Sequence, residues 1–144
     1  GEWGQNPIPG PMDDYEKSIK RHCGRIGAIE VFLSGPGLEK WYEFSTGVKK
    51  SSKEVVELFR GGEEEAIGIM DKYFERTAKA FSTFINILDP DVIVLGGGMS
   101  DIDEIYDVIP KKIIPYIASD TFLTPISKAK HGSASGVRGA AHLW

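Results

Sequence analysis

Apolar side chains recur every three or four positions through the middle of the chain, and this is the clearest pattern in the sequence. The stripe consists of Ile67, Met70, Phe74, Ala78, Phe81, Ile85 and Leu88. This spacing predicts a long helix that buries one face, and such a stripe far more often forms a core than binds a cofactor. Glutamates at positions 63–65 suit the start of the helix, where the helix dipole favours negative charge, and Pro90 is expected to end it.

A shorter helix is predicted just before the long one. Ser51 and Glu54 have the spacing of a capping box, in which each side chain accepts a hydrogen bond from the other residue's backbone N–H. Gly61 follows as the C-terminal cap. The apolar face of this helix would be made of Val55, Leu58 and Phe59.

The first third of the chain has weaker patterns. Residues 15–22 can form one helical turn before Gly24 stops it. Residues 28–33, "AIEVFL", are apolar apart from Glu30, and their periodicity does not separate a helix from a strand. The glycines and proline of "SGPG" at 34–37 predict a turn.

The last third alternates strand and helix patterns. Residues 92–95 are mostly β-branched, as expected for a strand covered on both faces. Residues 121–127 can form a second strand, with Pro125 at an edge or a strand end. A helix opened by Ser100 or Asp101 lies between them, and a small-residue helix follows the second strand. The residues expected to face inward from the middle helix are Ile102, Ile105 and Ile109. This alternation indicates an α/β fold with a partial sheet and packed helices, which suggests part of a larger fold.

Composition narrows the classes of function. The chain has 144 residues, 41% hydrophobic and 26% charged, which is typical of one soluble globular domain. A formal net charge of −4 argues against a nucleic-acid-binding face, which needs clustered lysine and arginine. Cys23 is the only cysteine, so no intramolecular disulfide can form and a cytoplasmic location is expected. No apolar run reaches the roughly 18 residues of a membrane helix.

Three glycines, Gly96, Gly97 and Gly98, lie between the predicted strand and the predicted helix. Open α/β sheets bind ligands at the carboxyl ends of their strands, and N–H groups at a helix start can face phosphate oxygens. Glycine is also the residue that a tight turn needs for steric reasons. Neither a Walker-type motif nor G-x-G-x-x-G is present. The residues alone therefore leave nucleotide or anion binding and a simple turn equally open.

Four segments of the chain match motifs of one known family in order and spacing. They are "GEWGQNP", "CGRIGAIE" with the following "SGPG", "NILDPDVIVLGGGMS" and "KHGSASGVRGAA". Together they resemble the C-terminal half of ROK-family sugar kinases, especially the bacterial fructokinase-like branch, over nearly all of residues 1–144. The resemblance implies a ribonuclease H-like fold of the actin/hexokinase ATPase type, with this chain as the C-terminal lobe. It also implies phosphoryl transfer from ATP, with Mg²⁺, to a hexose in a homo-oligomeric enzyme.

The resemblance assigns site residues position by position. Glu2 and Glu30 match two glutamates that hold sugar hydroxyls in the family, and Gln5 stands where the family has a histidine. Two carboxylates suit a polyol because each accepts charge-assisted hydrogen bonds from neighbouring hydroxyls. Without the resemblance, both glutamates would be interpreted as solvated surface residues. The positions that match nucleotide-binding motifs of the family are Gly96, Gly97, Gly98, Gly35 and Pro36.

The family also has a structural zinc site, and most of its ligands are replaced in this chain. The four ligand positions read Gln5, Arg21, Cys23 and Ala28. Structural zinc needs four ligands, usually cysteine or histidine, and only one of the four is left. We therefore predict that the zinc is lost.

The loop around the former zinc site is expected to keep its shape without the metal. Gly24 and Gly27 would preserve its backbone path. Cys23 is interpreted as a small buried hydrophobe. The side chains predicted to replace the metal cross-link by packing are Ile26, Ala28 and Ile29.

Part of a kinase site is expected outside these residues. In the family the catalytic base and a phosphate loop belong to the N-terminal half, so no catalytic residue is assigned here and the chain alone is expected to be inactive. Asp89, Asp91 and Asp101 are interpreted as turn and cap residues. Two alternatives to a kinase remain: the sugar-sensing domain of a ROK-type transcriptional repressor, and a degenerate homologue.

Overall fold

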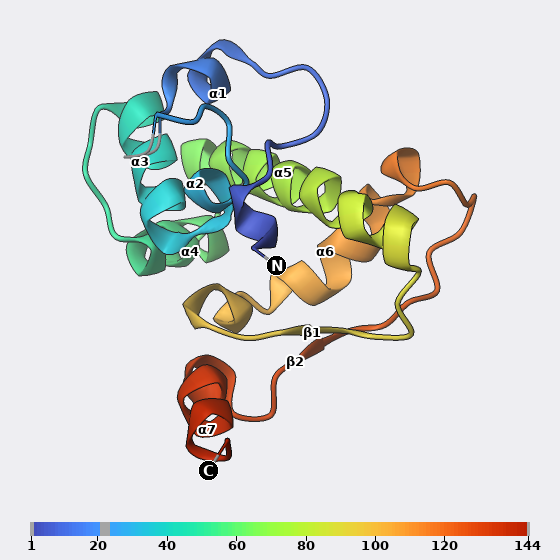
Figure 1. Ribbon diagram of the computed structural model, residues 1–144. Coiled ribbons are helices and arrows are strands. Elements are labelled where there is room, and N and C mark those ends of the chain that lie inside the picture. The colour runs from blue at the N-terminus through green and yellow to red at the C-terminus, as the bar shows by residue number, and fades with distance from the viewer. Residues whose placement is uncertain (1, 21–23, 144) are drawn as a thin grey trace.

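One long helix forms the centre of the fold, and shorter helices and a small sheet surround it (Figure 1). The computed structural model of the protein describes residues 2–20 and 24–143. The α-helices are α1 Asp14–Ser18, α2 Glu30–Leu33, α3 Gly35–Thr46, α4 Ser52–Arg60, α5 Glu64–Leu88, α6 Glu104–Lys112 and α7 Ser135–Ala141. The strands are β1 Ile93–Leu95 and β2 Ile126–Lys128. Short 3₁₀ helices are η1 Trp3–Gln5, η2 Gly98–Asp101, η3 Ile114–Tyr116 and η4 Gly132–Ala134.

The central helix α5 forms the core as predicted, with a correction at each end. Its buried apolar stripe includes Met70, Phe74, Ala78, Phe81 and Ile85. Ile67 and Leu88 are 44% and 69% exposed, so neither belongs to the stripe. The helices that pack on α5, which are α2, α3, α4 and α6, leave those two positions uncovered. The helix ends at Leu88, two residues before Pro90, and the left-handed residue Asp89 caps it.

Two helices begin with capping boxes. At α4 the Ser51 Oγ accepts from the Glu54 N–H at 3.3 Å, and the Glu54 carboxylate accepts from the Ser51 N–H at 2.9 Å, which confirms the prediction. Gly61 caps the other end of α4, as expected. At α1 the partners are Asp13 and Glu16, a box that the sequence analysis did not predict. The predicted turn of helix within 15–22 is present, although it ends at Ser18 rather than near Gly24.

The chain around residue 34 differs from the prediction. The ambiguous apolar run forms helix α2, and "SGPG" opens the 12-residue helix α3 instead of making a turn. Ser34 caps α3 by accepting from the Gly37 N–H at 3.2 Å, and Pro36 lies in the first turn, where its missing N–H is not needed. A side chain on Gly37 would collide with the Val31 carbonyl, so this glycine serves the close contact of α2 and α3. The turn prediction was wrong because serine, glycine and proline also suit a helix start.

Strands β1 and β2 pair in parallel, with Ile93 opposite Ile126 and Leu95 opposite Lys128. The first strand was predicted to be covered on both faces. Instead Ile93 is buried while Val94 is 60% exposed, because the core covers only one face of the sheet within this chain. Pro125 lies directly before β2, where its carbonyl accepts from the Ile93 N–H at 2.9 Å, in agreement with a strand end.

Helix α6 lies between the strands in the sequence and packs on α5, and the predicted inward residues Ile105 and Ile109 on α6, with Ile102 just before it, are buried. It begins later than predicted: Ser100 and Asp101 belong to the separate 3₁₀ helix η2, and Asp103 occupies the N-cap position of α6 without a side-chain capping hydrogen bond. The small-residue helix α7 is present as expected and lies at the far end of the molecule (Figure 1).

Within residues 2–20 and 24–143, no helix combines the length and apolar character that a membrane crossing requires.

Candidate functional site

Two segments that are distant in sequence lie side by side at the start of the chain. Pro7 and Ala28 form an antiparallel bridge. The Ile8 N–H donates to the Gly27 carbonyl at 2.8 Å, and the Ile29 N–H donates to the Asn6 carbonyl at 2.9 Å. These bonds place the loop that follows Glu2 next to the start of helix α2, which begins at Glu30.

The three predicted sugar-contacting residues therefore come together. Gly4 lies between the two glutamates: a Cβ built on Gly4 would be 3.2 Å from the Glu30 Cβ and 3.7 Å from the Glu2 Oε1. The Gln5 Nε2 donates to the Glu30 Oε2 at 3.5 Å. Two carboxylates can accept hydrogen bonds from hydroxyls, and an amide can both donate and accept. The arrangement thus offers both kinds of group to a polyhydroxy ligand.

The loop between these segments agrees only partly with the prediction. Gly24 and Gly27 have φ angles of 81° and 71°, so both hold left-handed turns that favour glycine. Ala28 and Ile29 are buried, but Ile26 is 44% exposed and does not replace a metal cross-link by packing. Ile26 lies in the isolated bridge with Lys20 on the exposed loop, which leaves its side chain facing outward.

The zinc prediction falls partly outside the structure. Two of the four former ligand positions, Arg21 and Cys23, lie outside the described residues. In the part of the chain that is described, no group of three or more histidine, cysteine, aspartate or glutamate side chains gathers in a way that could hold a metal ion.

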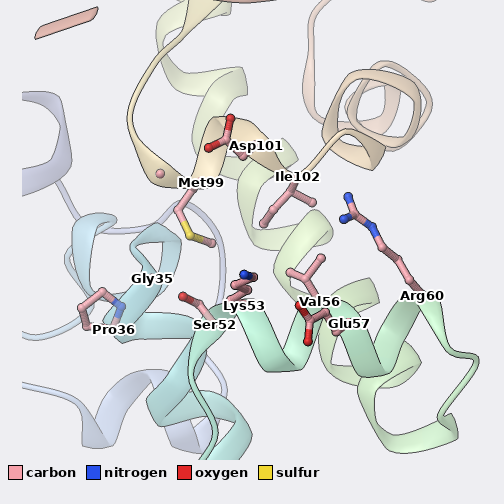
Figure 2. A pocket seen from close by; sticks show the side chains of 11 residues that line it. Gly35, Pro36, Ser52, Lys53, Val56, Glu57, Arg60, Met99, Asp101 and Ile102 are labelled. Carbon is pink, nitrogen blue, oxygen red and sulfur yellow. The ribbon is translucent and has the colours of Figure 1, made fainter. Parts of the chain in front are cut away.

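A second site is a pocket of about 570 Å³ between the start of α3, helix α4 and the glycine-rich loop after β1 (Figure 2). Three of the predicted nucleotide-binding residues line it together, namely Gly35, Pro36 and Gly98. The other lining residues are Ser52, Lys53, Val56, Glu57, Arg60, Met99, Asp101 and Ile102. Segments about 60 residues apart thus build one cavity, with apolar walls for a flat ring and charged groups at its edge.

The glycine triplet makes a tight turn, and one of its residues lines the pocket. Gly97 has a φ of 86°, so it makes a left-handed turn for which glycine is suited. Gly98 lines the pocket. Gly96 lies beside the other strand instead, because a Cβ there would meet Ala129 at 3.7 Å. Ser100, which is buried, closes this turn by donating from its hydroxyl to the Gly97 carbonyl at 2.6 Å.

Helix α4 supplies pocket residues that the sequence analysis missed. Lys53, Val56, Glu57 and Arg60 follow one another at helical spacing, and their charges resemble an ordinary solvated helix face. Only the pocket that α4 shares with the glycine-rich loop distinguishes them. Figure 2 shows Met99 extending from that loop toward α3 and α4, and its sulfur would lie 3.6 Å from a Cβ on Gly35.

Two ion pairs border the pocket. Arg60 donates to Glu104 from Nε at 2.7 Å and from Nη2 at 2.9 Å, which joins α4 to α6. The hydrogen bond from Arg60 holds the pKa of the Glu104 carboxyl below its ordinary value, and the same bond raises the pKa of Arg60. Lys128 on β2 pairs with Asp101 at 2.9 Å. Asp101, interpreted from sequence as a turn or cap residue, therefore borders the pocket in an ion pair.

Comparison with known proteins identifies the family of the chain. The sequence model of the ROK family matches residues 1–144. The N-acetyl-D-glucosamine kinase of Pectobacterium atrosepticum is 36% identical over 147 residues, which cover 99% of this chain and 48% of that protein. The N-acetyl-D-glucosamine kinase of Vibrio atlanticus is 41% identical over 121 residues, which cover 84% of this chain and 40% of that protein. The chain spans about half the length, or less, of these curated relatives.

Solved structures show the same fold. The ROK hexokinase from Thermus thermophilus has a TM-score of 0.79 at 22% identity, with 98% of this chain and 46% of that chain covered. A ROK family glucokinase from Streptomyces griseus, solved with glucose and AMPPNP, has a TM-score of 0.79 at 20% identity, with 99% and 50% covered. The fold is therefore of the actin/hexokinase ATPase type, here rich in helix with a small parallel sheet. With a family match over its whole length, the chain belongs to the ROK family.

Proposed function

We propose that this chain is the C-terminal, sugar- and nucleotide-binding part of an ATP-dependent hexose kinase. The observation that carries the proposal is the pocket in which Gly35 and Pro36 of α3 meet Gly98 of the glycine-rich loop. These three residues were assigned to the nucleotide from sequence motifs that lie far apart, and they line one cavity. In a sugar kinase, a cavity of this kind would bind the nucleotide that donates the phosphoryl group.

The proposed roles divide between the two sites. Pro36, Val56, Met99 and Ile102 would enclose the adenine ring, because they provide the apolar walls of the pocket. Mg²⁺ would accompany the nucleotide and neutralise phosphate charge during transfer.

At the other site, Glu2, Gln5 and Glu30 would hold the hexose hydroxyls. Carboxylates orient a polyol by accepting its hydroxyl protons in hydrogen bonds. The group that accepts the proton of the attacked hydroxyl is proposed to come from outside this chain, and the active protein is proposed to be a cytoplasmic homo-oligomer.

The substrate is proposed to be a hexose or an N-acetylhexosamine. A fructokinase was expected from the motif resemblance, whereas the curated relatives described above are N-acetyl-D-glucosamine kinases. N-acetylglucosamine is therefore the first substrate to test, ahead of glucose and fructose.

Activity of the full-length protein tests the proposal. ADP release is measured with Mg-ATP and, in separate reactions, N-acetylglucosamine, glucose, mannose and fructose. We expect turnover with one of these sugars, and loss of most of it in Glu30→Gln. Absence of turnover with every sugar, together with hexose binding in calorimetry, would favour the sugar-sensing alternative. Absence of both would favour the degenerate homologue.

A further inference from the structure

One face of helix α5 holds both halves of the proposed sugar site. The Trp3 indole N–H, in η1 beside Glu2, donates to the Thr83 hydroxyl at 2.9 Å. The Tyr73 hydroxyl donates to the Leu33 carbonyl at the end of α2, at 3.1 Å. Arg76 lies between these two positions, and residues 73, 76 and 83 share a helical face because they are three and seven positions apart.

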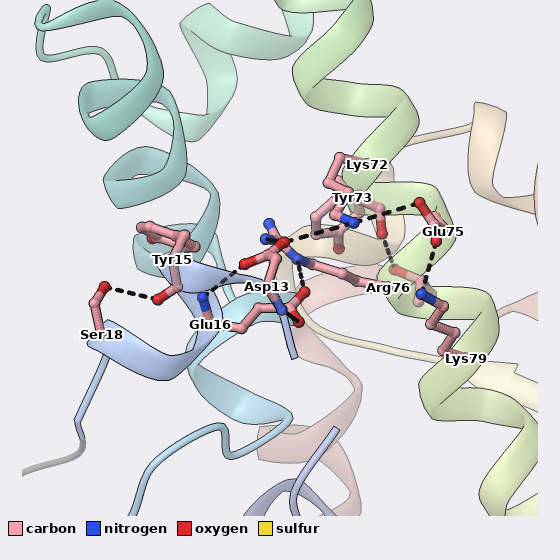
Figure 3. A network of polar contacts seen from close by, with 10 residues as sticks. Asp13, Tyr15, Glu16, Ser18, Lys72, Tyr73, Glu75, Arg76 and Lys79 are labelled. Atoms are coloured by element: carbon pink, nitrogen blue, oxygen red, sulfur yellow. Dashed lines mark hydrogen bonds and ion pairs between the residues drawn. The ribbon is translucent and has the colours of Figure 1, made fainter. Parts of the chain in front are cut away.

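Arg76 is the most completely enclosed charge in this region. Its side chain is 2% exposed, and its Nε donates to the Glu16 Oε1 at 2.7 Å. Its Nη2 also pairs with the Asp13 carboxylate at 3.3 Å. Both carboxylates belong to the capping box that opens α1 (Figure 3). A buried guanidinium with two carboxylate partners is held in one orientation, since each alternative would leave a charge unpaired.

Three aromatic rings from three different helices surround the same guanidinium. The Arg76 Cζ atom lies 4.5 Å from the ring centre of Trp41 on α3. It lies 5.3 Å from the ring centre of Tyr15 on α1 and 5.4 Å from that of Phe32 on α2. Arg76 therefore contacts helices α1, α2 and α3. Phe32 is two residues from Glu30 in the four-residue helix α2, so the position of Phe32 sets the position of the carboxylate.

Helix α2 is held in place by its tertiary contacts. It has four residues, which is too short to be stable without tertiary contacts. Helix α2 packs on α3, its start is hydrogen-bonded to the Glu2 loop through the Ile29 N–H and the Asn6 carbonyl, and its links to α5 include the packing of Phe32 near Arg76 and Ala80 and the hydrogen bond from Tyr73. Loss of the Arg76 contact would remove the charged group against which Phe32 packs, so we expect the Phe32 end of α2 to shift while the Thr83 bond still holds Trp3 beside Glu2.

We infer that Arg76 is a positioning residue for sugar binding: it holds α2, and with it Glu30, at a fixed separation from Glu2. This rests on the proposed function, because it concerns the same sugar site. Arg76 itself is buried away from solvent and does not touch the substrate. Its guanidinium links the α1 capping box and three aromatic rings to α5, and the consequence is a preformed pair of carboxylates.

Kinetics of the full-length protein test this inference, with N-acetylglucosamine or the hexose that the substrate panel identifies. In Arg76→Met we expect the KM for the sugar to rise about tenfold or more, because a displacement of about 1 Å in a binding group is costly, while the KM for ATP stays the same. Arg76→Lys should restore part of the sugar affinity, since lysine keeps the charge but not the planar stacking.

A matched control separates positioning from general destabilisation. Met70→Ala removes a fully buried side chain from the same helix, but Met70 belongs to the main core cluster, whereas Phe32 beside Arg76 belongs to the separate cluster with Tyr15 and Ala80. We expect Met70→Ala to lower the melting temperature without changing the KM for the sugar. If Arg76→Met only lowers the melting temperature and leaves the sugar KM unchanged, the inference is wrong.

Hydrogen exchange gives a readout that does not depend on kinase activity. In Arg76→Met the amides of Phe32 and Leu33 in α2 should exchange at least about tenfold faster, while the amides of α6 keep their protection. Unchanged exchange in α2 would contradict the inference even if no sugar is phosphorylated. Absence of turnover in the unmodified protein would instead count against the proposed function.

Discussion

Arg60 and Glu104 form a bidentate ion pair at the edge of the pocket, which joins α4 to α6. The Arg60 side chain is 44% exposed and the Glu104 side chain 28%. A pair this open to water contributes about 1 kcal/mol or less to folding, because solvent screens it. Its larger effect is expected on the pocket that it borders, where it fixes the spacing of the two helices.

Arg60→Gln should therefore change nucleotide affinity more than stability. We expect the KM for ATP to rise roughly fivefold, which corresponds to about 1 kcal/mol, with the sugar KM unchanged. Steady-state kinetics with varied ATP measure this. Lys49→Gln is the matched control, because it removes a surface ion pair with Glu43 that does not border this pocket. Equal changes in both variants would show that the effect is only one of surface charge.

Gly4→Ala should weaken sugar binding. The added methyl would lie 3.2 Å from the Glu30 Cβ, closer than the roughly 3.5–4.0 Å of a comfortable carbon–carbon contact. Glu30 must then move away from Glu2, so we expect the KM for the sugar to rise several-fold while the melting temperature hardly changes. An unchanged KM would mean that the separation of the two carboxylates does not matter for binding.

Gly68→Ala should raise stability and leave binding unchanged, because a side chain at this glycine would meet no other residue. Gly68 is exposed inside α5, and a Cβ there would meet nothing within 4 Å. Alanine is expected to stabilise the helix by about 0.5–1 kcal/mol, because glycine loses more backbone entropy on folding. Chemical denaturation measures this gain, and the kinetic constants should stay the same. A loss of stability would show that the helix is packed differently at this position.

Glu54 should make the stability depend on pH at acid values. Hydrogen bonds from the Ser51 N–H and hydroxyl lower the pKa of Glu54 from 4.5 to about 2. A carboxyl whose pKa is lowered by folding stabilises the folded state fully above its unfolded pKa, and this stabilisation is lost as the pH falls through the folded value. The contribution of Glu54 is thus complete above about pH 4.5 and fades toward pH 2.

Glu54→Gln tests this dependence. Glutamine can still cap the helix but does not titrate, so denaturation measured between pH 2 and pH 6 should show a shallower loss of stability than in the unmodified protein. Above pH 5 the difference between the two proteins should be constant. Identical pH profiles would show that the capping box does not form in solution.

The loss of zinc remains a prediction that elemental analysis can decide. We expect less than one equivalent of tightly bound zinc per chain in protein purified without added metal, because glutamine and alanine occupy two of the four ligand positions. Treatment with EDTA should leave the melting temperature unchanged. One firmly held equivalent of zinc would contradict the prediction and would require ligands other than those of the family site.

Local sequence signals determined much of the helical structure. The capping box at Ser51 and Glu54, the apolar stripe of α5 and the stop before Pro90 depend on residues close together in the chain, so the pattern alone predicts them. The motif resemblance likewise indicated the family, and three of the residues that it assigned to a nucleotide line one pocket. The residues "SGPG" are compatible with both a turn and a helix start. A turn was predicted there, and the structure has the start of α3.

Only the tertiary structure decided which residues meet. The α4 side of the pocket could not be predicted, because Lys53, Glu57 and Arg60 have the pattern of a solvated helix face and only the folded chain makes them line one cavity with Gly98. The ion pair of Asp101 with Lys128 could not be predicted for the same reason, since Lys128 lies on strand β2. The ion pairs of Arg76 with Glu16 and Asp13 cross 60 or more positions of sequence. Local patterns predict hydrogen bonds and periodicity within one segment of the chain. Burial and charge pairing depend instead on contacts between segments, which exist only after the chain has folded.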